Sequence, residues 1–293
     1  WGKSTPRGNN TITLVELAEK FIQYYWKLSM KFKIKENNYA MNEIKKVCKR
    51  CNQSQGATLE NFISEFPDEY NNLVNRIRGK AFKDVIRRLH NGVPVQGCAK
   101  LFEYDDLGEE ALGDELTIPL QARQFLISHY SVVKNLALGS WVKFSEKTTN
   151  SPRLYQKISG EIKREDLGKF DTFFSEDVNQ TNCFYCNREL MANQRARDHV
   201  IPWSFILEDK AWNLVLCCQR CNSQKSDKIP NNNYIENLFL RNSELLAPSY
   251  NFINAQAIKD FVGWTDNREG LEIHIKNMLN QCRSEGFEDW INQ

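Results

Sequence analysis

Apolar residues recur with helical spacing over much of the first part of the chain. Thr13 followed by Glu16 forms a capping-box pattern, and an apolar stripe then runs through residues 14–25. A second helix is predicted over residues 70–89, with apolar residues on one face, basic residues on the other and an Asn-Gly pair after its end. We therefore expect the N-terminal part of the chain to be helical.

The pattern changes further along the chain. A Thr-Ile-Pro sequence at residues 117–119 predicts the start of a helix, which leads into a periodic segment over residues 120–144. Short β-prone pieces separated by Cys, Asn and Pro begin near residue 170, and helical spacing returns after residue 230. We predict a fold that is mostly α, and α+β overall. Its expected parts are a helical domain, a small mixed module and a helical tail that packs back on the body, over residues 1–170, 171–230 and 231–293.

Length and composition agree with an ordinary globular protein. The 293 residues suffice for roughly two domains, and the hydrophobic and charged fractions are 41% and 26%. No run of the sequence approaches the roughly 20 apolar residues that a membrane-spanning helix needs, so we expect no membrane insertion. The net charge of +2 is too small to indicate a nucleic-acid partner, because only a local basic face would do so.

Two Cys-x-x-Cys pairs change this picture. Cys183 and Cys186 form the first pair, Cys218 and Cys221 form the second, and a segment of roughly thirty residues lies between them. Four thiolates at this spacing can close a tetrahedral Zn²⁺ site, which leaves no open position for a substrate and would therefore be structural. Cys217 could replace Cys218 as a ligand by a one-residue shift. Cysteines grouped in this way favour a reducing compartment, and we expect a cytoplasmic protein.

A third Cys-x-x-Cys pair is less informative. Cys48 and Cys51 could belong to a second zinc site completed by Cys98 and His90. No second close pair accompanies them, however, so we favour the interpretation that they are ordinary thiols near a helix.

The segment between the two zinc pairs predicts a β-hairpin followed by a helix. Residues 195–201 form a short strand, residues 213–217 form a second strand, and residues 222–227 begin a helix. A ββα piece this small cannot bury enough apolar surface alone, so the zinc would hold its ends together.

The polar residues of this segment indicate phosphodiester chemistry. Asp198 and Asn222 offer hard oxygen atoms of the kind that Mg²⁺ or Mn²⁺ takes from a protein. His199, next to Asp198, can act as a general base at neutral pH. Arg195 and Arg197 adjoin these residues and are candidates for contact with phosphate. A metal, a base and space for a phosphate together suggest hydrolysis of a nucleic acid.

These motifs resemble the HNH endonuclease family, the ββα-metal nucleases with a zinc-knuckle scaffold. The resemblance covers residues 183–230 and rests on the sequences DHVIPWSF, WNLV and CNxxKSD, which are also similar to the HNH domain of RNA-guided CRISPR nucleases. The last His of the eponymous pattern is Asn222 here, a variant that leaves the metal role intact. The fold that the resemblance implies is an embedded ββα-metal module.

The resemblance also implies a role for each matching residue. His199 would activate the attacking water, while Asp198 and Asn222 would hold one divalent ion against the scissile phosphate. Asn213 would brace the loop that orients His199, and Lys225 would approach phosphate oxygens. The expected products are 5′-phosphate and 3′-hydroxyl ends.

We predict a DNA endonuclease, in the setting of prokaryotic restriction or phage defence that the resemblance implies. An RNA-cleaving nuclease is the alternative enzyme, because the hydrolytic groups see only a phosphodiester. The alternative outside the enzymes is a zinc-stabilised module that binds a nucleic acid or a protein without turnover. The N-terminal helices could bind DNA, an activating ligand or a partner subunit. Because they are large relative to the module, we hypothesise that they restrain it until it is activated.

Overall fold

The computed structural model divides the chain into two compact units, Trp1–Thr149 and Asn150–Gln293. No helix within the described part of the chain is long and apolar enough to cross a membrane. The structure describes residues 10–36, 38–53, 56–82, 85–86, 101–106, 112–191, 194–265 and 267–291.

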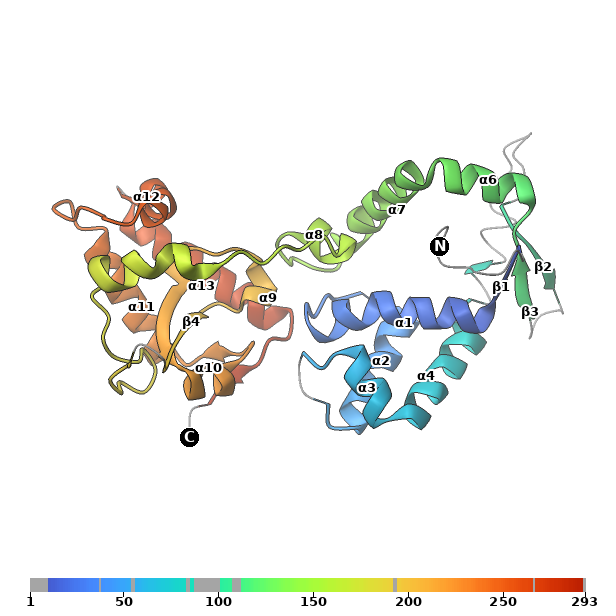
Figure 1. Cartoon of the computed structure of the whole chain (residues 1–293), viewed down its shortest axis with the longest axis horizontal. Coiled ribbons are helices and arrows are strands. Elements are labelled where there is room, and N and C mark those ends of the chain that lie inside the picture. The colour runs from blue at the N-terminus through green and yellow to red at the C-terminus, as the bar shows by residue number, and fades with distance from the viewer. Residues whose placement is uncertain are drawn as a thin grey trace. The chain divides into compact units, whose positions relative to one another are not determined.

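Four helices build the core of the N-terminal unit (Figure 1). The first, α1 (Leu14–Met30), begins at the predicted capping box, in which Thr13 and Glu16 bond to each other's backbone. Apolar residues spaced three or four apart on each helix meet in one cluster, which includes Ile22, Ile44, Phe62 and Ile77. The other three helices are α2 (Tyr39–Arg50), α3 (Leu59–Glu65) and α4 (Pro67–Lys80).

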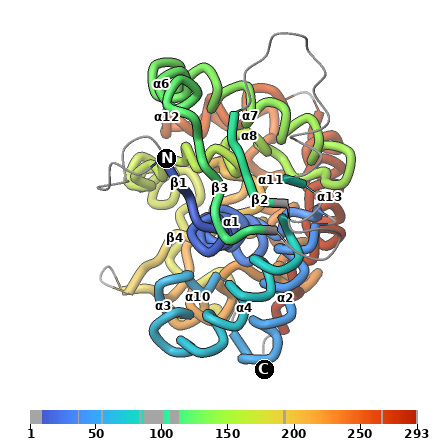
Figure 2. The backbone as a smooth tube through the Cα atoms, turned by 90° about the vertical axis from the view of Figure 1, so that its right-hand side faces the viewer, coloured from blue at the N-terminus to red at the C-terminus, as the bar shows by residue number. Residues whose placement is uncertain are grey.

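A small antiparallel sheet adjoins these helices (Figure 2). Its strands β1 (Thr11–Thr13), β2 (Glu103–Asp106) and β3 (Leu112–Thr117) lie in the order β1-β3-β2. Two further helices follow, α6 (Leu120–Ser128) and α7 (Tyr130–Ser145).

Glu36 ties α7 to the rest of the N-terminal unit. Its Oε1 accepts hydrogen bonds from Trp141 Nε1, at 2.6 Å, and from the Ser145 hydroxyl. Trp141 also meets Tyr25 of α1 edge to face. Several apolar side chains of α6 and α7 nevertheless stay exposed, among them Phe125, Val132, Leu136 and Phe144.

The C-terminal unit places a β-hairpin at the centre of a second core. The strands β4 (Arg195–His199) and β5 (Leu214–Cys218) pair antiparallel, and every residue of β5 is buried. Helices of the C-terminal tail join the same cluster, including α11 (Asn232–Leu245) and α13 (Arg268–Ser284). These helices therefore share one core with the hairpin. The remaining elements are α8 (Leu154–Ser159), η1 (Leu167–Phe170), η2 (Phe173–Asp177), α9 (Trp203–Ile206), η4 (Ala211–Asn213), α10 (Gln219–Lys225), α12 (Ala255–Phe261), η5 (Val262–Trp264) and the short parallel pair β6 (Ile229–Pro230) and β7 (Asp289–Trp290).

Two organisational predictions differ from this structure. The division between units falls after Thr149, before the boundary expected at residue 170, and residues 171–230 and 231–293 share one core. The helix expected over residues 70–89 begins at Pro67, a favourable first helical residue, and ends at Lys80. The end predicted for it, the Asn-Gly pair that follows, and the possible ligands His90 and Cys98 lie outside the described residues.

Candidate active site

The β4–β5 hairpin and α10 bring the candidate residues into one small region. Asp198 lies opposite Val215 and His199 opposite Leu214 in the antiparallel register. Helix α10 follows β5 directly, and Cys218 caps it by accepting the backbone N–H of Cys221. The elements follow one another as strand, strand and helix, but β4 ends two residues before the predicted end and α10 begins at Gln219, three residues before the predicted start.

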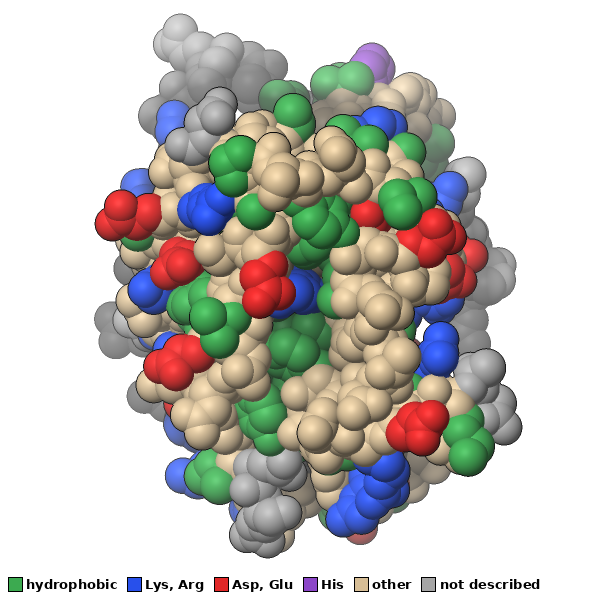
Figure 3. All heavy atoms as spheres, turned by 90° about the vertical axis from the view of Figure 1, so that its left-hand side faces the viewer, with side chains coloured by type: hydrophobic (Ala, Val, Ile, Leu, Met, Phe, Trp, Pro, Cys, Tyr) green, Lys and Arg blue, Asp and Glu red, His purple; other side chains and the backbone are tan. Residues whose placement is uncertain are grey.

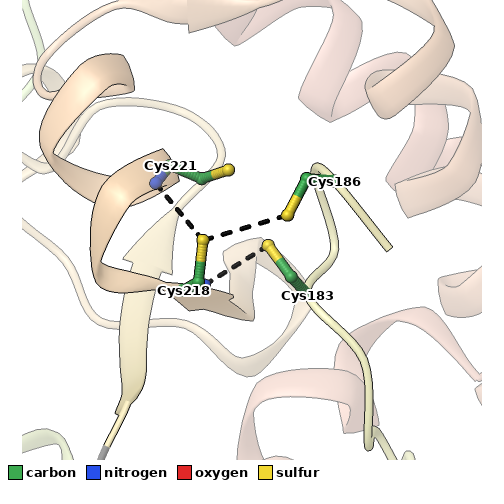
Figure 4. A group of neighbouring side chains, drawn as sticks. All are labelled: Cys183, Cys186, Cys218 and Cys221. Carbon is green, nitrogen blue, oxygen red and sulfur yellow. Dashed lines mark hydrogen bonds between the residues drawn. The ribbon is translucent and has the colours of Figure 1, made fainter. Parts of the chain in front are cut away.

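The four predicted zinc ligands meet at one end of this hairpin (Figure 4). Their Sγ atoms all lie within 4.8 Å of one another, and those of Cys186 and Cys218 are 3.9 Å apart. Zinc–sulfur bonds of about 2.3 Å place the thiolates of a tetrahedral site roughly 3.8 Å apart, so the cluster fits a zinc ion. The complete ligand set is Cys183, Cys186, Cys218 and Cys221.

The other cysteines that the structure describes lie outside this site. Cys217 is fully buried in β5 and does not join the cluster, so the one-residue shift does not occur. Cys48 and Cys51 lie at the end of α2, and no other group of three or more candidate ligands occurs among residues that the structure describes.

Backbone hydrogen bonds prepare the cluster for metal binding. The Cys218 N–H points at the sulfur of Cys183, at 3.3 Å, and the Cys221 N–H points at the sulfur of Cys218, at 3.4 Å. Burial opposes ionisation of Cys218, but the Cys221 N–H and neighbouring thiols outweigh it and lower the pKa of Cys218 to about 7. Thiolates that accept N–H bonds are oriented ligands for a metal.

Asp198 belongs to a buried polar network that reaches the zinc knuckle. Its Oδ2 accepts the hydroxyl of Tyr185 at 2.5 Å and lies 3.0 Å from Lys225 Nζ. Tyr185 stands between the two cysteines of the first pair, so one residue joins the thiolate cluster to the carboxylate. The structure describes no hydrogen bond on the second oxygen, Oδ1, of Asp198, which suits it as the ligand of a divalent ion.

Lys225 lies in a different place from the one expected. Its side chain is completely buried, and its ammonium donates to the backbone carbonyl of His199, at 2.7 Å, besides pairing with Asp198. A buried ammonium with these partners holds the end of β4 against α10 and does not face solvent, where a phosphate would be.

Asn222 lies on α10 one turn before Lys225. Residues three apart share a helix face, so Asn222 lies on the side of α10 that meets Asp198 and His199. Its side chain is half-buried, and the described residues give it no hydrogen bond. A carboxylate and an amide on adjoining elements form a donor set that a divalent ion can use while keeping water ligands.

His199 is constrained both through the backbone that follows it and through its ring. Asn213, fully buried, accepts the N–H of Ile201 at 2.8 Å and donates to its carbonyl at 3.0 Å, which fixes the chain two residues after His199. His199 Nε2 itself lies 2.9 Å from Asp209 Oδ1. Burial opposes ionisation of Asp209, but the hydrogen bond and the charge of His199 prevail and lower its pKa.

Sequence reasoning did not anticipate Asp209 or Tyr185. The position of Tyr185 within the first cysteine pair could have drawn attention to it. Asp209 carries no comparable signal, because its contact with His199 depends on how the loop after α9 returns to the strand.

The two predicted arginines lie at the surface of the hairpin. Arg195 donates to the carbonyl of Leu190, and Arg197 pairs with Asp171, with 2.8 Å between Nε and Oδ1. On the face of the molecule shown in Figure 3, basic side chains lie among acidic ones and do not form one basic patch.

The comparisons with known proteins agree with this geometry. Residues 183–231 match the model of the HNH endonuclease family, which confirms the resemblance seen in the sequence. No match was found among curated proteins.

One solved structure shows a weak likeness, the crystal structure of a type II-C Cas9 enzyme from Actinomyces naeslundii. It is 12% identical over 85% of this chain, with a TM-score of 0.25, and the chain covers 24% of that enzyme. A likeness this weak supports no statement about the fold or activity of the whole chain.

Proposed function

We propose that the chain is a metal-dependent endonuclease that hydrolyses phosphodiester bonds of DNA. One observation carries the proposal: Asp198 and His199 end a strand beside α10, the helix of Asn222, within the residues that match the HNH endonuclease family. Oxygen ligands and a general base on adjoining elements are the parts that single-metal hydrolysis requires.

The two metal sites have separate tasks. Zn²⁺ on the four cysteines would hold the hairpin to α10 and take no part in the reaction. Mg²⁺ or Mn²⁺ at Asp198 and Asn222 would supply positive charge to the scissile phosphate and to the departing 3′ oxygen.

The protein's own side chains accept the proton of the attacking water and position the reacting groups. His199 accepts the proton of the attacking water, while Asn213 keeps the backbone beyond His199 in place. Departure of the 3′ oxygen leaves 5′-phosphate and 3′-hydroxyl ends. Lys225 serves this step by holding Asp198 and the His199 carbonyl, and Arg195 and Arg197 are the residues that we assign to the phosphate backbone.

Cleavage assays with purified protein test the proposal. Supercoiled plasmid and labelled single-stranded RNA are incubated with Mg²⁺ or Mn²⁺, beside His199→Ala and Asn222→Ala. We expect plasmid cleavage that either substitution lowers by about 10²-fold or more, because each removes a group of the reaction itself. His129→Ala, at an exposed histidine of the N-terminal unit, is the matched control and should cleave like the wild type.

The same assay separates the alternatives. Cleavage of RNA alone would replace the proposed substrate. Binding of a nucleic acid that survives EDTA, without cleavage under either metal, would favour the zinc-stabilised binding module instead.

We further propose that the N-terminal unit restrains the nuclease until an activating ligand or partner subunit binds, as in a restriction or phage-defence protein. The exposed apolar side chains of α6 and α7 support a binding role for this unit. Residues 150–293 have a core of their own and can be tested as a fragment. A fragment that cleaves no faster than the whole chain would contradict restraint.

A further inference from the structure

His199 and Asp209 form a short contact between two buried side chains. His199 Nε2 and Asp209 Oδ1 are 2.9 Å apart, and the two side chains are only 4% and 8% exposed. A contact this short between buried groups is a hydrogen bond little weakened by competing water.

The loop that carries Asp209 is fixed on both sides. Before Asp209, Glu208 pairs with Arg153, whose Nε lies 2.8 Å from Oε1. After it, Asp260 accepts the Lys210 ammonium at 3.2 Å and the Ala211 N–H at 2.9 Å. The carboxylate is therefore presented to the ring by a braced loop.

A carboxylate in this place determines which ring nitrogen carries the proton. An ionised Asp only accepts hydrogen bonds, so Nε2 must be the protonated nitrogen of a neutral His199. The lone pair is then on Nδ1, and only Nδ1 can take a proton from water. As the ring gains that proton, the neighbouring negative charge stabilises the imidazolium.

We propose that Asp209 is a positioning residue that fixes the ring and the tautomer of His199, so that Nδ1 is the base of the reaction. This inference rests on the proposed nuclease function. It adds to that function a residue outside the three sequence motifs DHVIPWSF, WNLV and CNxxKSD. Asp209 does not touch the substrate and acts only through the imidazole.

Two substitutions distinguish this role from a structural one. In Asp209→Asn the amide can donate to Nε2 and so select the wrong tautomer, with the proton on Nδ1, whereas Asp209→Ala leaves the ring free to adopt either. We expect the single-turnover cleavage rate to fall about 10²-fold or more for Asn, and less for Ala, with half-saturation by DNA unchanged in both. Glu244→Gln, at an exposed acid of α11 outside this loop, is the matched control and should stay within about twofold of wild type.

A merely structural role predicts the reverse order. Asn preserves the shape and a hydrogen bond, so it would then be the milder substitution, and Ala would lose both activity and stability. That order would overturn the proposal.

A nitrogen NMR measurement tests the tautomer without any cleavage. The chain has four histidines, so ¹⁵N-labelled rings can be assigned with a His199→Gln variant. In the zinc-loaded protein with a neutral His199 ring, we expect a protonated Nε2 for His199 and a loss of that preference in Asp209→Asn. A wild-type His199 protonated on Nδ1 would overturn the role of Asp209, whereas a wild type that cleaves no nucleic acid would overturn the proposed function instead.

Discussion

The interiors of the two units differ in kind. The main core cluster of the N-terminal unit consists of apolar side chains from four helices, together with Phe82, Ile86 and the strand residue Leu116. The C-terminal unit buries charged and polar groups beside one end of its hairpin, namely Asp198, His199, Asn213 and Lys225. Buried charges contribute little net stability even when paired, so a fold that keeps several of them at one place keeps them for another purpose. The contrast supports the placement of the proposed chemistry in the C-terminal unit.

The two interiors should also respond differently to substitutions. An apolar core loses stability in proportion to the atoms removed. A network such as Tyr185–Asp198–Lys225 depends on every member, because the loss of one leaves another buried without its partner.

Removal of the proposed zinc should cause the largest loss of stability, and this loss should be confined to the C-terminal unit. Zinc binding supplies roughly 10–16 kcal/mol to small domains that fold around it, so chelation should unfold the C-terminal unit and leave the apolar N-terminal core folded. Hydrogen exchange measured separately over β4–β5 and α1–α4 reports the two units. Cys218→Ala should reproduce the effect, while Cys48→Ala, at a buried cysteine of the N-terminal unit, should not. Equal loss of protection in both units would contradict the comparison.

The substitution Lys225→Met should have the next largest effect. It leaves the buried Asp198 carboxylate with Tyr185 as its described partner and frees the His199 carbonyl, which should lower the free energy of unfolding by about 3–5 kcal/mol. Urea denaturation of the zinc-loaded protein measures it. Arg197→Met removes a partly exposed ion pair with Asp171 and should cost less than about 1 kcal/mol. Similar costs for the two would mean that burial of Lys225 does not matter.

Local sequence allowed the hairpin and the four-cysteine cluster to be predicted. Both depend on close spacing, in the two Cys-x-x-Cys pairs and in the strands that carry Asp198 and Cys217, so the chain has little freedom to arrange them otherwise. The capping box at Thr13 was predicted for the same reason.

Contacts across the fold could not be predicted in this way. The hydrophobic pattern does not show to which core a segment belongs, and residues 150–170 join the C-terminal unit through contacts such as the Lys157 ammonium with the Phe205 carbonyl. The inward path of Lys225 and the pairing of Asp209 depend on how elements pack. The family resemblance had implied that Lys225 approaches phosphate oxygens.

The N-terminal unit offers a smaller test at Glu36, a buried acid that α7 contacts through Trp141 and Ser145. Glu36→Ala should leave Trp141 Nε1 and the Ser145 hydroxyl without their acceptor, at a cost of about 1–3 kcal/mol. Because this tie lies outside the apolar cluster, exchange should quicken in α7 while α1–α4 stay protected. Glu60→Ala, at an exposed acid of α3, is the control and should change neither. A general loss of protection in the unit would show that its stability also depends on a buried charge.

The smallest expected effect is a pH dependence centred on Lys157 in the C-terminal unit. Burial lowers the pKa of this lysine to about 7, although Cys282 and Glu285 oppose the shift. Between pH 7 and the ordinary lysine pKa, the unfolded chain therefore binds more protons at this residue than the folded one, and the free energy of unfolding rises with pH. The gain from pH 7 to pH 8 should be about 1 kcal/mol.

The buried thiols Cys217 and Cys282 act in the opposite direction, because burial raises their pKa and the unfolded chain loses their protons first. Urea denaturation of the wild type and of Lys157→Met at both pH values isolates the contribution of Lys157. The pH dependence that comes from the thiols and from zinc binding is common to both proteins and cancels in the difference. A variant with the same pH dependence as wild type would mean that Lys157 stays charged in the folded protein, held by the Ser151 hydroxyl and the Phe205 carbonyl.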